Sequence, residues 1–129
     1  PVGAGHSMKL LHNYVSLGTV ALLAEAAACA ARNGVAPEVF VDVLTKGGGG
    51  GTALTRLQPF LLTGDANGLK FSIANAAKDL GYYHQMAGDA GAALGIAGAV
   101  LATLQTAQAQ CAPGTFLPEL ARLLQRQPD

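Results

Sequence analysis

The sequence predicts an all-α domain of about six helices, built around one long N-terminal helix. No segment alternates polar and apolar residues with the period of two that a strand requires. Hydrophobic residues make up 50 % of the 129-residue chain and charged residues only 12 %, so the chain can bury a core and is not disordered. Glycine and proline separate the long Ala- and Leu-rich stretches and mark the expected helix ends.

The first helix is predicted from Met8 to about Arg32, with Ser7 as its N-cap and Asn33-Gly34 as its C-cap. It is apolar nearly all round, which suits a helix packed on several sides. Its stretch from Tyr14 to Ala31 is long enough to raise the question of a membrane span. Glu25 within that stretch and the predominance of Ala favour a buried core helix instead.

The second helix is predicted to begin at Pro37, where a missing N–H costs nothing, and to end at Lys46. The run Gly47–Gly51 stops it, because each glycine in a helix costs about 1 kcal/mol relative to alanine. Ser72 is a suitable N-cap for the fourth helix. The later helices are expected at about 53–62, 73–94, 99–110 and 117–125.

Composition excludes several classes of function. Eight Lys and Arg balance eight Asp and Glu, and a chain without net positive charge lacks the electrostatic footprint of a nucleic-acid-binding protein. Cys29 and Cys111 are too few for a disulfide framework and are expected to be free, buried thiols. The three histidines show no metal-ligand spacing, and no metal site is predicted.

Lys9 and Asn13 are the first candidates for chemistry. They are four residues apart, so they share one face of the predicted helix. The i−3 and i+3 neighbours of Lys9 are His6 and His12, so no carboxylate lies within one turn. A lysine without an acidic partner beside an apolar helix can be shielded from water, which a general acid or base requires. The alternative is a surface lysine at the start of a helix.

Two further segments have both a functional and a structural interpretation. Within Lys78-Asp79-Leu80-Gly81, Lys78 has no acidic residue on its own helical face, and both charges are otherwise expected to be solvated. The run Gly47–Gly51 is not a Walker loop, because Thr52-Ala53 follows it instead of Lys-Ser or Lys-Thr. It is either a connector or a loop that closes on a small substrate.

The residues from Gly3 to Asn13 resemble the β-hydroxyacid dehydrogenase family, which includes 3-hydroxyisobutyrate dehydrogenase and tartronate semialdehyde reductase. The family pattern G-x-G-x-x-x-K-x-x-x-N is matched by Gly3, Gly5, Lys9 and Asn13. A second pattern, K-x-L-G-x-x-x-D, is matched by Lys78-Asp79-Leu80-Gly81. It departs at its last position, where Gln85 replaces the acid. The resemblance covers essentially the whole chain.

The resemblance implies roles for individual residues. Lys9 is expected to be the general acid/base, with Asn13 and Gly5 binding the substrate beside it. Lys78 is expected near the cofactor and Phe71 at the nicotinamide side. The Gly47–Gly51 run falls where the family has a substrate-facing segment. Since it carries no hydroxyl donors, any contact from it to a substrate carboxylate must come from backbone amides.

The resemblance further implies that residues 1–129 are a single all-α C-terminal domain, of the type found in 6-phosphogluconate dehydrogenase, without the N-terminal dinucleotide-binding domain. The expected cofactor is NAD or NADP, bound mainly by that other domain, and the substrate is a small hydroxyacid or semialdehyde. The expected partners are its own N-terminal domain and further copies, as a homodimer or homotetramer. A cytoplasmic oxidoreductase is expected, with no nucleic acid or membrane as partner, and the isolated domain is expected to be inactive.

Two alternatives remain open at this point. A non-catalytic helical dimerisation module of the same fold would explain the departure at Gln85 and the Gly47–Gly51 run. A small membrane-embedded helical protein would explain the apolar stretch Tyr14–Ala31. Binding of dinucleotide without oxidation of any hydroxyacid would favour the first, and solubility without detergent would dispose of the second.

Overall fold

The computed structural model describes residues 3–125, which form six α-helices and two short 3-10 helices. No strand occurs among these residues, and Ser72 and Phe116 form an isolated antiparallel bridge. The all-α prediction with one long N-terminal helix is confirmed. The elements in chain order are α1 (Gly3–Arg32), α2 (Pro37–Lys46), α3 (Thr52–Thr63), η1 (Ala66–Gly68), α4 (Ile73–Asp89), α5 (Gly95–Ala109), η2 (Leu117–Glu119) and α6 (Leu120–Leu123).

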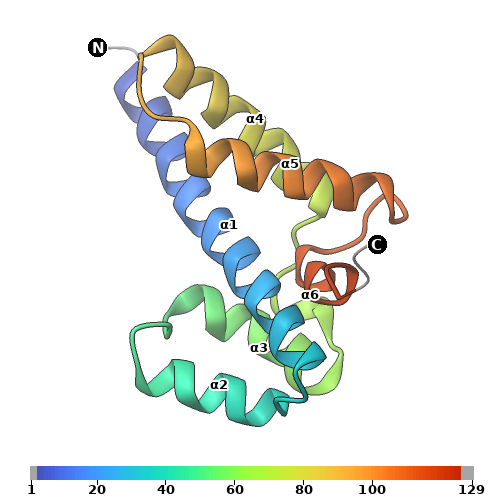
Figure 1. The fold of residues 1–129 in the computed structure, drawn as a ribbon. Coiled ribbons are helices and arrows are strands. Elements are labelled where there is room, and N and C mark those ends of the chain that lie inside the picture. The colour runs from blue at the N-terminus through green and yellow to red at the C-terminus, as the bar shows by residue number, and fades with distance from the viewer. Residues whose placement is uncertain (1–2, 126–129) are drawn as a thin grey trace.

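The long helix α1 organises the molecule. In Figure 1 it runs the length of the structure, with α4 and α5 packed on each other beside its N-terminal half. The helices α2, α3 and α6 gather around its C-terminal half. Since α1 contacts all five other α-helices, side chains at different levels of this one helix face different parts of the fold.

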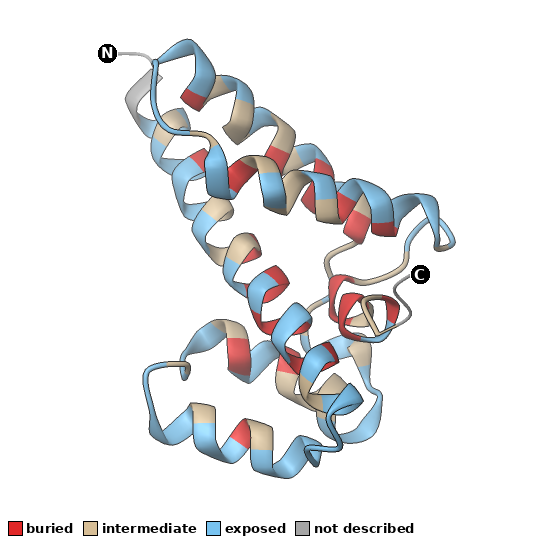
Figure 2. Ribbon diagram, in the orientation of Figure 1, coloured by how far each residue is buried: buried red, intermediate tan, exposed pale blue. Residues whose placement is uncertain are grey.

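The core lies on one side of α1. Buried side chains of α1, α4, α5, η2 and α6 form one cluster that includes Val20, Leu80, Leu104 and Leu120. A smaller cluster of Leu23 with Leu54 and Leu57 joins α1 to α3. Figure 2 shows the buried residues on the sides of the helices that face one another. Burial of this apolar surface, at roughly 25 cal/mol per Å², is the main term that holds the helices together.

The opposite side of α1 is not covered, which differs from the expectation of a helix packed on several sides. Met8, Val15 and Leu22 are exposed although they are large and apolar. Within the described residues, α1 is also long and apolar enough to cross a membrane, but 39 % of its apolar window is buried inside this fold. Core helices of soluble proteins pass the same test, so the uncovered side of α1 is the feature to explain.

Helix α1 begins earlier than predicted. Residues from Gly3 onward are already helical, so Ser7 lies inside the helix and the prediction that it is the N-cap is wrong. The predicted C-terminal signal is confirmed, because Gly34 has a φ of 76° and the amide of Val35 donates back to the carbonyl of Ala30. The predicted bounds of α2 and the cap by Ser72, whose hydroxyl accepts from the amide of Asn75, are confirmed as well.

The boundary between α4 and α5 was predicted in the wrong place. Helix α4 ends at Asp89, because Gly91 takes a φ of 73° and the amide of Ala92 donates to the carbonyl of Ala87. Gly95 starts α5 and Gly98 lies inside it, although both were expected to precede the helix. At the C-terminal end, the single predicted helix 117–125 is divided into η2 and the four-residue α6.

Both cysteines are free, as predicted, but neither is buried. Cys29 is exposed on α1, and Cys111 is partly exposed after α5. The expectation of buried thiols is therefore wrong. For Cys29 the cause is the uncovered side of α1 that also exposes Leu22.

Candidate functional site

Gly5, Lys9 and Asn13 follow one another at four-residue intervals in α1 and therefore share one face of the helix. The position where a side chain at Gly5 would begin has no atom within 4 Å, so the space beside it is open. Lys9 is exposed, while Asn13 is half-buried. Solvent exposure on this face therefore decreases over two turns, from the open position at Gly5 to the half-buried Asn13.

The amine of Lys9 is not shielded by the described residues. Among residues 3–125 it forms no ion pair, and it lines none of their four main cavities. The apolar surroundings expected for this amine from the sequence are therefore not supplied by this part of the chain. A proton-transferring lysine at this position depends on another surface to exclude water from it.

Asn13 is held by a residue from the second signature segment. Its Nδ2 donates a hydrogen bond of 3.4 Å to Oδ2 of Asp79 on α4. On its other side, Oδ1 of Asn13 lies 3.4 Å from Nδ1 of His12. The two signature segments, 66 residues apart in sequence at these positions, meet in space through this pair.

Asp79 was expected to be a solvated charge, and that expectation is wrong. It is half-buried and bonded to Asn13. A signal for this was present in the sequence, because Asp79 lies three residues after Ala76 and four before Tyr83, in step with the residues of α4 that face α1.

One turn further along, an aromatic pair reinforces the contact between α1 and α4. The rings of Tyr14 and Tyr83 stack with centroids 4.0 Å apart and planes inclined by 12°. Burial, and secondarily the proximity of Tyr83, raises the pKa of the Tyr14 phenol above its usual 10.0. Sequence reasoning missed this pair, although position 83 follows position 79 by one turn on the same face of α4.

The two residues expected at the cofactor are arranged differently from each other. Lys78 is exposed on α4, with Nζ 6.0 Å from the ring centroid of Tyr82. Phe71 is half-buried against the main core cluster, and its carbonyl accepts a 2.7 Å hydrogen bond from the amide of Leu117. Neither residue lines any of the four main cavities of the described chain.

An open cavity with both polar and apolar lining residues lies next to the face of Lys9. It has a volume of about 290 Å³ and is lined by α1, the end of the glycine run and the first turn of α3. His12, Ser16 and Thr19 line its α1 side. Because Lys9 precedes His12 by three residues and Ser16 by seven, it lies on the same side of α1 as both, about one turn beyond the cavity.

The opposite wall of this cavity carries backbone amides. Helix α3 begins at Thr52, its N-cap Gly51 has no side chain, and no side chain caps its first turn. Free amides at a helix N-terminus favour an anionic group through their hydrogen bonds and the helix dipole. Ser16 was not singled out from the sequence, since only the fold places it opposite the Gly49–Gly51 segment.

Close packing also explains why glycine occupies positions 49 and 50 of the run. A Cβ at Gly50 would lie 3.0 Å from the carbonyl oxygen of Thr45, and one at Gly49 would collide with the side chain of Leu44. The loop therefore passes closely against the end of α2 before it reaches the cavity. This packing makes the run a fitted wall of the cavity rather than a loose connector.

A protein-family model matches most of the chain. The model of the family described as the NAD-binding domain of NADP-dependent 3-hydroxyisobutyrate dehydrogenase matches residues 3–124. No curated protein matches the chain. The matched range contains the face of Lys9 and Asn13, the glycine run and the Lys78-Asp79 segment.

Proposed function

The chain belongs to the family of NAD-binding domains of NADP-dependent 3-hydroxyisobutyrate dehydrogenase, and from this premise we propose its function. It is the C-terminal catalytic and oligomerisation domain of an NAD(P)-dependent oxidoreductase. The enzyme interconverts a small β-hydroxyacid and its semialdehyde. The observation that carries this proposal is the convergence of both signature segments at the Asn13–Asp79 hydrogen bond, beside the cavity lined by His12 and Ser16.

Lys9 is the proposed general acid/base. In the reducing direction its ammonium group gives a proton to the carbonyl oxygen of the semialdehyde, and in oxidation its amine takes the hydroxyl proton. Its position about one turn beyond the cavity of His12 and Ser16 supports this role. Its exposure in this chain requires that a second domain cover it during the reaction.

The cavity is the proposed substrate site. The first-turn amides of α3 bind the substrate carboxylate, since the glycine run itself has only backbone donors and Thr52 adds one hydroxyl on that side. The side-chain oxygen of Asn13 accepts a hydrogen bond from the hydroxyl of the hydroxyacid, beside Lys9. The open space at Gly5 leaves room for the substrate to enter along the same face of α1.

The described residues fit one side of a dinucleotide site and do not enclose it. Lys78 offers an exposed ammonium group that would hold an anionic part of NAD or NADP, and Phe71 lies at the start of α4 with its ring turned into the core cluster. When bound, the cofactor supplies or accepts the hydride. The remaining contacts are assigned to an N-terminal dinucleotide-binding domain, which also covers Lys9, so residues 1–129 alone have no dehydrogenase activity.

The test is the substitution of Lys9 in the full-length enzyme that carries this chain. Lys9→Ala and Lys9→Arg are both expected to lower turnover of 3-hydroxyisobutyrate and related hydroxyacids by roughly 10²–10⁴-fold, because neither can transfer the proton. Dinucleotide affinity, measured by fluorescence titration, should change less than about threefold, since Lys9 does not serve cofactor binding in this proposal.

Arg122→Ala is the matched control, because Arg122 is a cation in a surface ion pair with Glu119 on η2, outside the site. Loss of one such pair is worth about 0–1 kcal/mol and should leave turnover unchanged. Retained turnover in Lys9→Ala would refute the proposed chemistry. If the unmodified enzyme binds dinucleotide yet oxidises no hydroxyacid, the second candidate, a non-catalytic helical module, is favoured, and the exchange at Gln85 supports it.

A further inference from the structure

The hydroxyl group of Ser16 lies in the wall of the proposed substrate cavity. Ser16 is half-buried in the middle of α1 and lines the cavity next to His12. A serine or threonine inside a helix commonly donates its hydroxyl to the carbonyl four residues earlier. Ser16 makes no such bond to His12, and its side chain has no other hydrogen bond within residues 3–125. Its hydroxyl is therefore free to bind a group inside the cavity.

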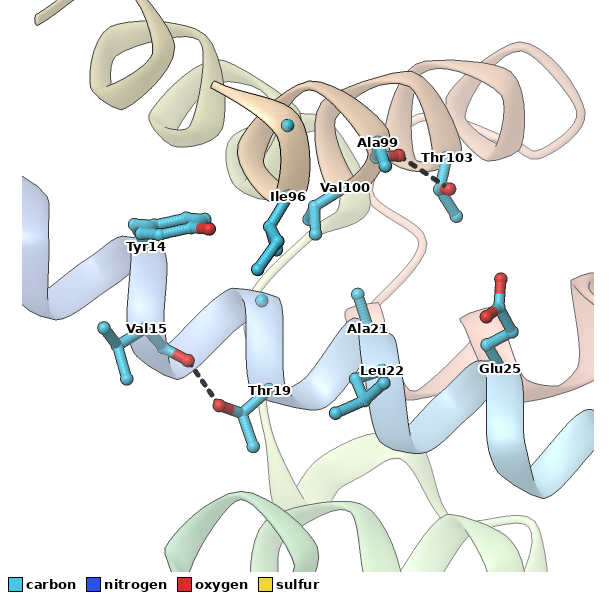
Figure 3. Close-up of a pocket in the computed structure, with 12 residues that line it drawn as sticks. Tyr14, Val15, Thr19, Ala21, Leu22, Glu25, Ile96, Ala99, Val100 and Thr103 are labelled. Atoms are coloured by element: carbon cyan, nitrogen blue, oxygen red, sulfur yellow. Dashed lines mark hydrogen bonds between the residues drawn. The ribbon is translucent and has the colours of Figure 1, made fainter. Parts of the chain in front are cut away.

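Thr19, on the same wall of the cavity, differs from Ser16. Its hydroxyl donates a hydrogen bond of 2.6 Å to the carbonyl of Val15. Thr103 on α5 donates in the same way to Ala99, at 2.9 Å, and Figure 3 shows both bonds as dashed lines. A hydroxyl whose hydrogen is used within its own helix keeps only its capacity to accept. The hydroxyl of Ser16 can both donate to a ligand and accept from it.

Ser16 lies between the two ends of the proposed site. The first-turn amides of α3, which bind the carboxylate in the proposed function, are on the opposite wall. Lys9 precedes Ser16 by seven residues, which is about 10.5 Å along the helix axis. The flexible four-carbon stem of a lysine can bridge much of this distance. A three-carbon hydroxyacid therefore fits between the amides and Lys9 with its middle carbon nearest Ser16.

The apolar residues of the lining do not cover the hydroxyl of Ser16. Leu23 and Leu54 are only 6 % and 2 % exposed, since they pack in a cluster with Leu57 and offer little surface to a ligand. Val15 is exposed, but adjacent residues of a helix point about 100° apart, so its side chain leaves Ser16 open. A substituent on the middle carbon of the substrate therefore meets a hydroxyl group.

We propose that Ser16 selects, among β-hydroxyacids, a substrate with a second hydroxyl group on the carbon next to the carboxylate. This selection rests on the proposed function, because it takes the cavity as the substrate site. Ser16 and the second hydroxyl form a hydrogen bond, whereas a methyl group at that carbon leaves the half-buried Ser16 hydroxyl without a partner. An unpaired polar group costs more than a hydrogen bond contributes, so such a site rejects the analogue that lacks the hydroxyl.

Two acids that differ at one carbon test this selection. Glycerate has a hydroxyl group where 3-hydroxyisobutyrate has a methyl group. Isothermal titration calorimetry on the full-length enzyme, with reduced dinucleotide so that neither acid is oxidised, should show glycerate binding at least about 10-fold more tightly. Ser16→Ala should weaken glycerate binding about 5- to 20-fold and change 3-hydroxyisobutyrate binding less than about twofold. The ratio of kcat/KM for the two acids should fall by the same factor.

Thr103→Val is the matched control, because it removes a half-buried hydroxyl from α5 and Thr103 does not line the cavity. It should leave both affinities unchanged, and circular dichroism should show the same helix content in both variants. Three results would each overturn the proposal. These are binding of neither acid, equal binding of both acids by the unmodified enzyme, and equal losses for both acids in Ser16→Ala.

The same measurements separate the role of Ser16 from the proposed chemistry. If the preference for glycerate depends on Ser16 but no hydroxyacid is oxidised, the catalytic role of Lys9 is refuted and the role of Ser16 stands. If Lys9→Ala abolishes turnover while Ser16→Ala leaves the preference unchanged, the proposed function stands and the role of Ser16 is refuted.

Discussion

The side-chain amide of Asn13 donates to the carboxylate of Asp79 across the interface of α1 and α4. An ionised carboxylate only accepts hydrogen bonds, so this contact fixes which end of the amide faces α4. The Nδ2 group turns toward Asp79, and Oδ1 is left on the side of His12. In the proposed active site Asn13 therefore presents a carbonyl oxygen, which suits a substrate hydroxyl or the Lys9 ammonium group as a donor.

Replacing Asp79 should remove the hydrogen bond that orients the Asn13 side chain and leave Asn13 itself in place. In the full-length enzyme, Asp79→Leu is expected to lower kcat/KM for a hydroxyacid about 5- to 20-fold, which corresponds to the roughly 1–2 kcal/mol of one lost hydrogen bond to a charged group. Asp79→Asn should recover most of the loss, since its amide oxygen can still accept from Asn13. Equal losses in both variants, or none, would show that the acceptor does not orient Asn13.

The start or end of a helix could be predicted from the sequence where a single residue determines it. Pro37 and the glycine run determine both ends of α2, Ser72 caps α4, and Gly34 ends α1, all as predicted. Each of these signals acts within one turn of the helix it starts or stops. Helix α1 extends past Ser7 because a serine inside a helix gives no stop signal when the preceding residues can also be helical.

Contacts between helices were not readable in the same way. Asp79 becomes half-buried and Ser16 becomes part of a cavity only because α4 and the glycine run approach α1. Gly91 rather than Gly95 ends α4, although a string of glycines offers several equivalent stops. Which glycine adopts the left-handed conformation depends on how far α4 can pack against α1 and α5 before it must turn.

The Tyr14–Tyr83 stack should contribute measurably to the stability of the fold. Tyr14→Ala is expected to lower the free energy of unfolding by about 2–3 kcal/mol, since it removes a half-buried ring and its aromatic partner. Tyr82→Ala, which removes an exposed ring one position earlier on α4, should cost less than about 1 kcal/mol. Urea denaturation followed by circular dichroism measures both. Similar losses in the two variants would mean that the stack does not stabilise the α1–α4 contact.

The raised pKa of Tyr14 makes a prediction at alkaline pH. Because the folded state disfavours the phenolate, the unfolded state loses this proton first, so stability is fully present below pH 10.0 and is lost as the pH rises through the folded pKa. Tyr14→Phe should therefore lose less stability than the unmodified chain above pH 10.0. In this variant the phenolate absorbance at alkaline pH should also lose a component that titrates above pH 10.0. An identical alkaline decline in both proteins would contradict the burial of the Tyr14 phenol.

Alanine substitutions at two glycines of the Gly47–Gly51 run test whether this loop packs closely against α2 or is a flexible connector. A methyl group at Gly50 would press on backbone atoms of Thr45 and Leu44, so Gly50→Ala should cost about 1 kcal/mol or more. Gly48 has no atom within 4 Å of such a group and keeps an ordinary φ, so Gly48→Ala should be neutral or stabilise by up to about 1 kcal/mol through the unfolded state. The midpoint temperature of thermal unfolding should thus fall for Gly50→Ala and stay the same or rise for Gly48→Ala. In the full-length enzyme Gly50→Ala should also raise KM, because Gly50 lines the cavity opposite Ser16 and Gly48 does not. Equal thermal stability and equal KM in the two variants would show that the run is a flexible connector.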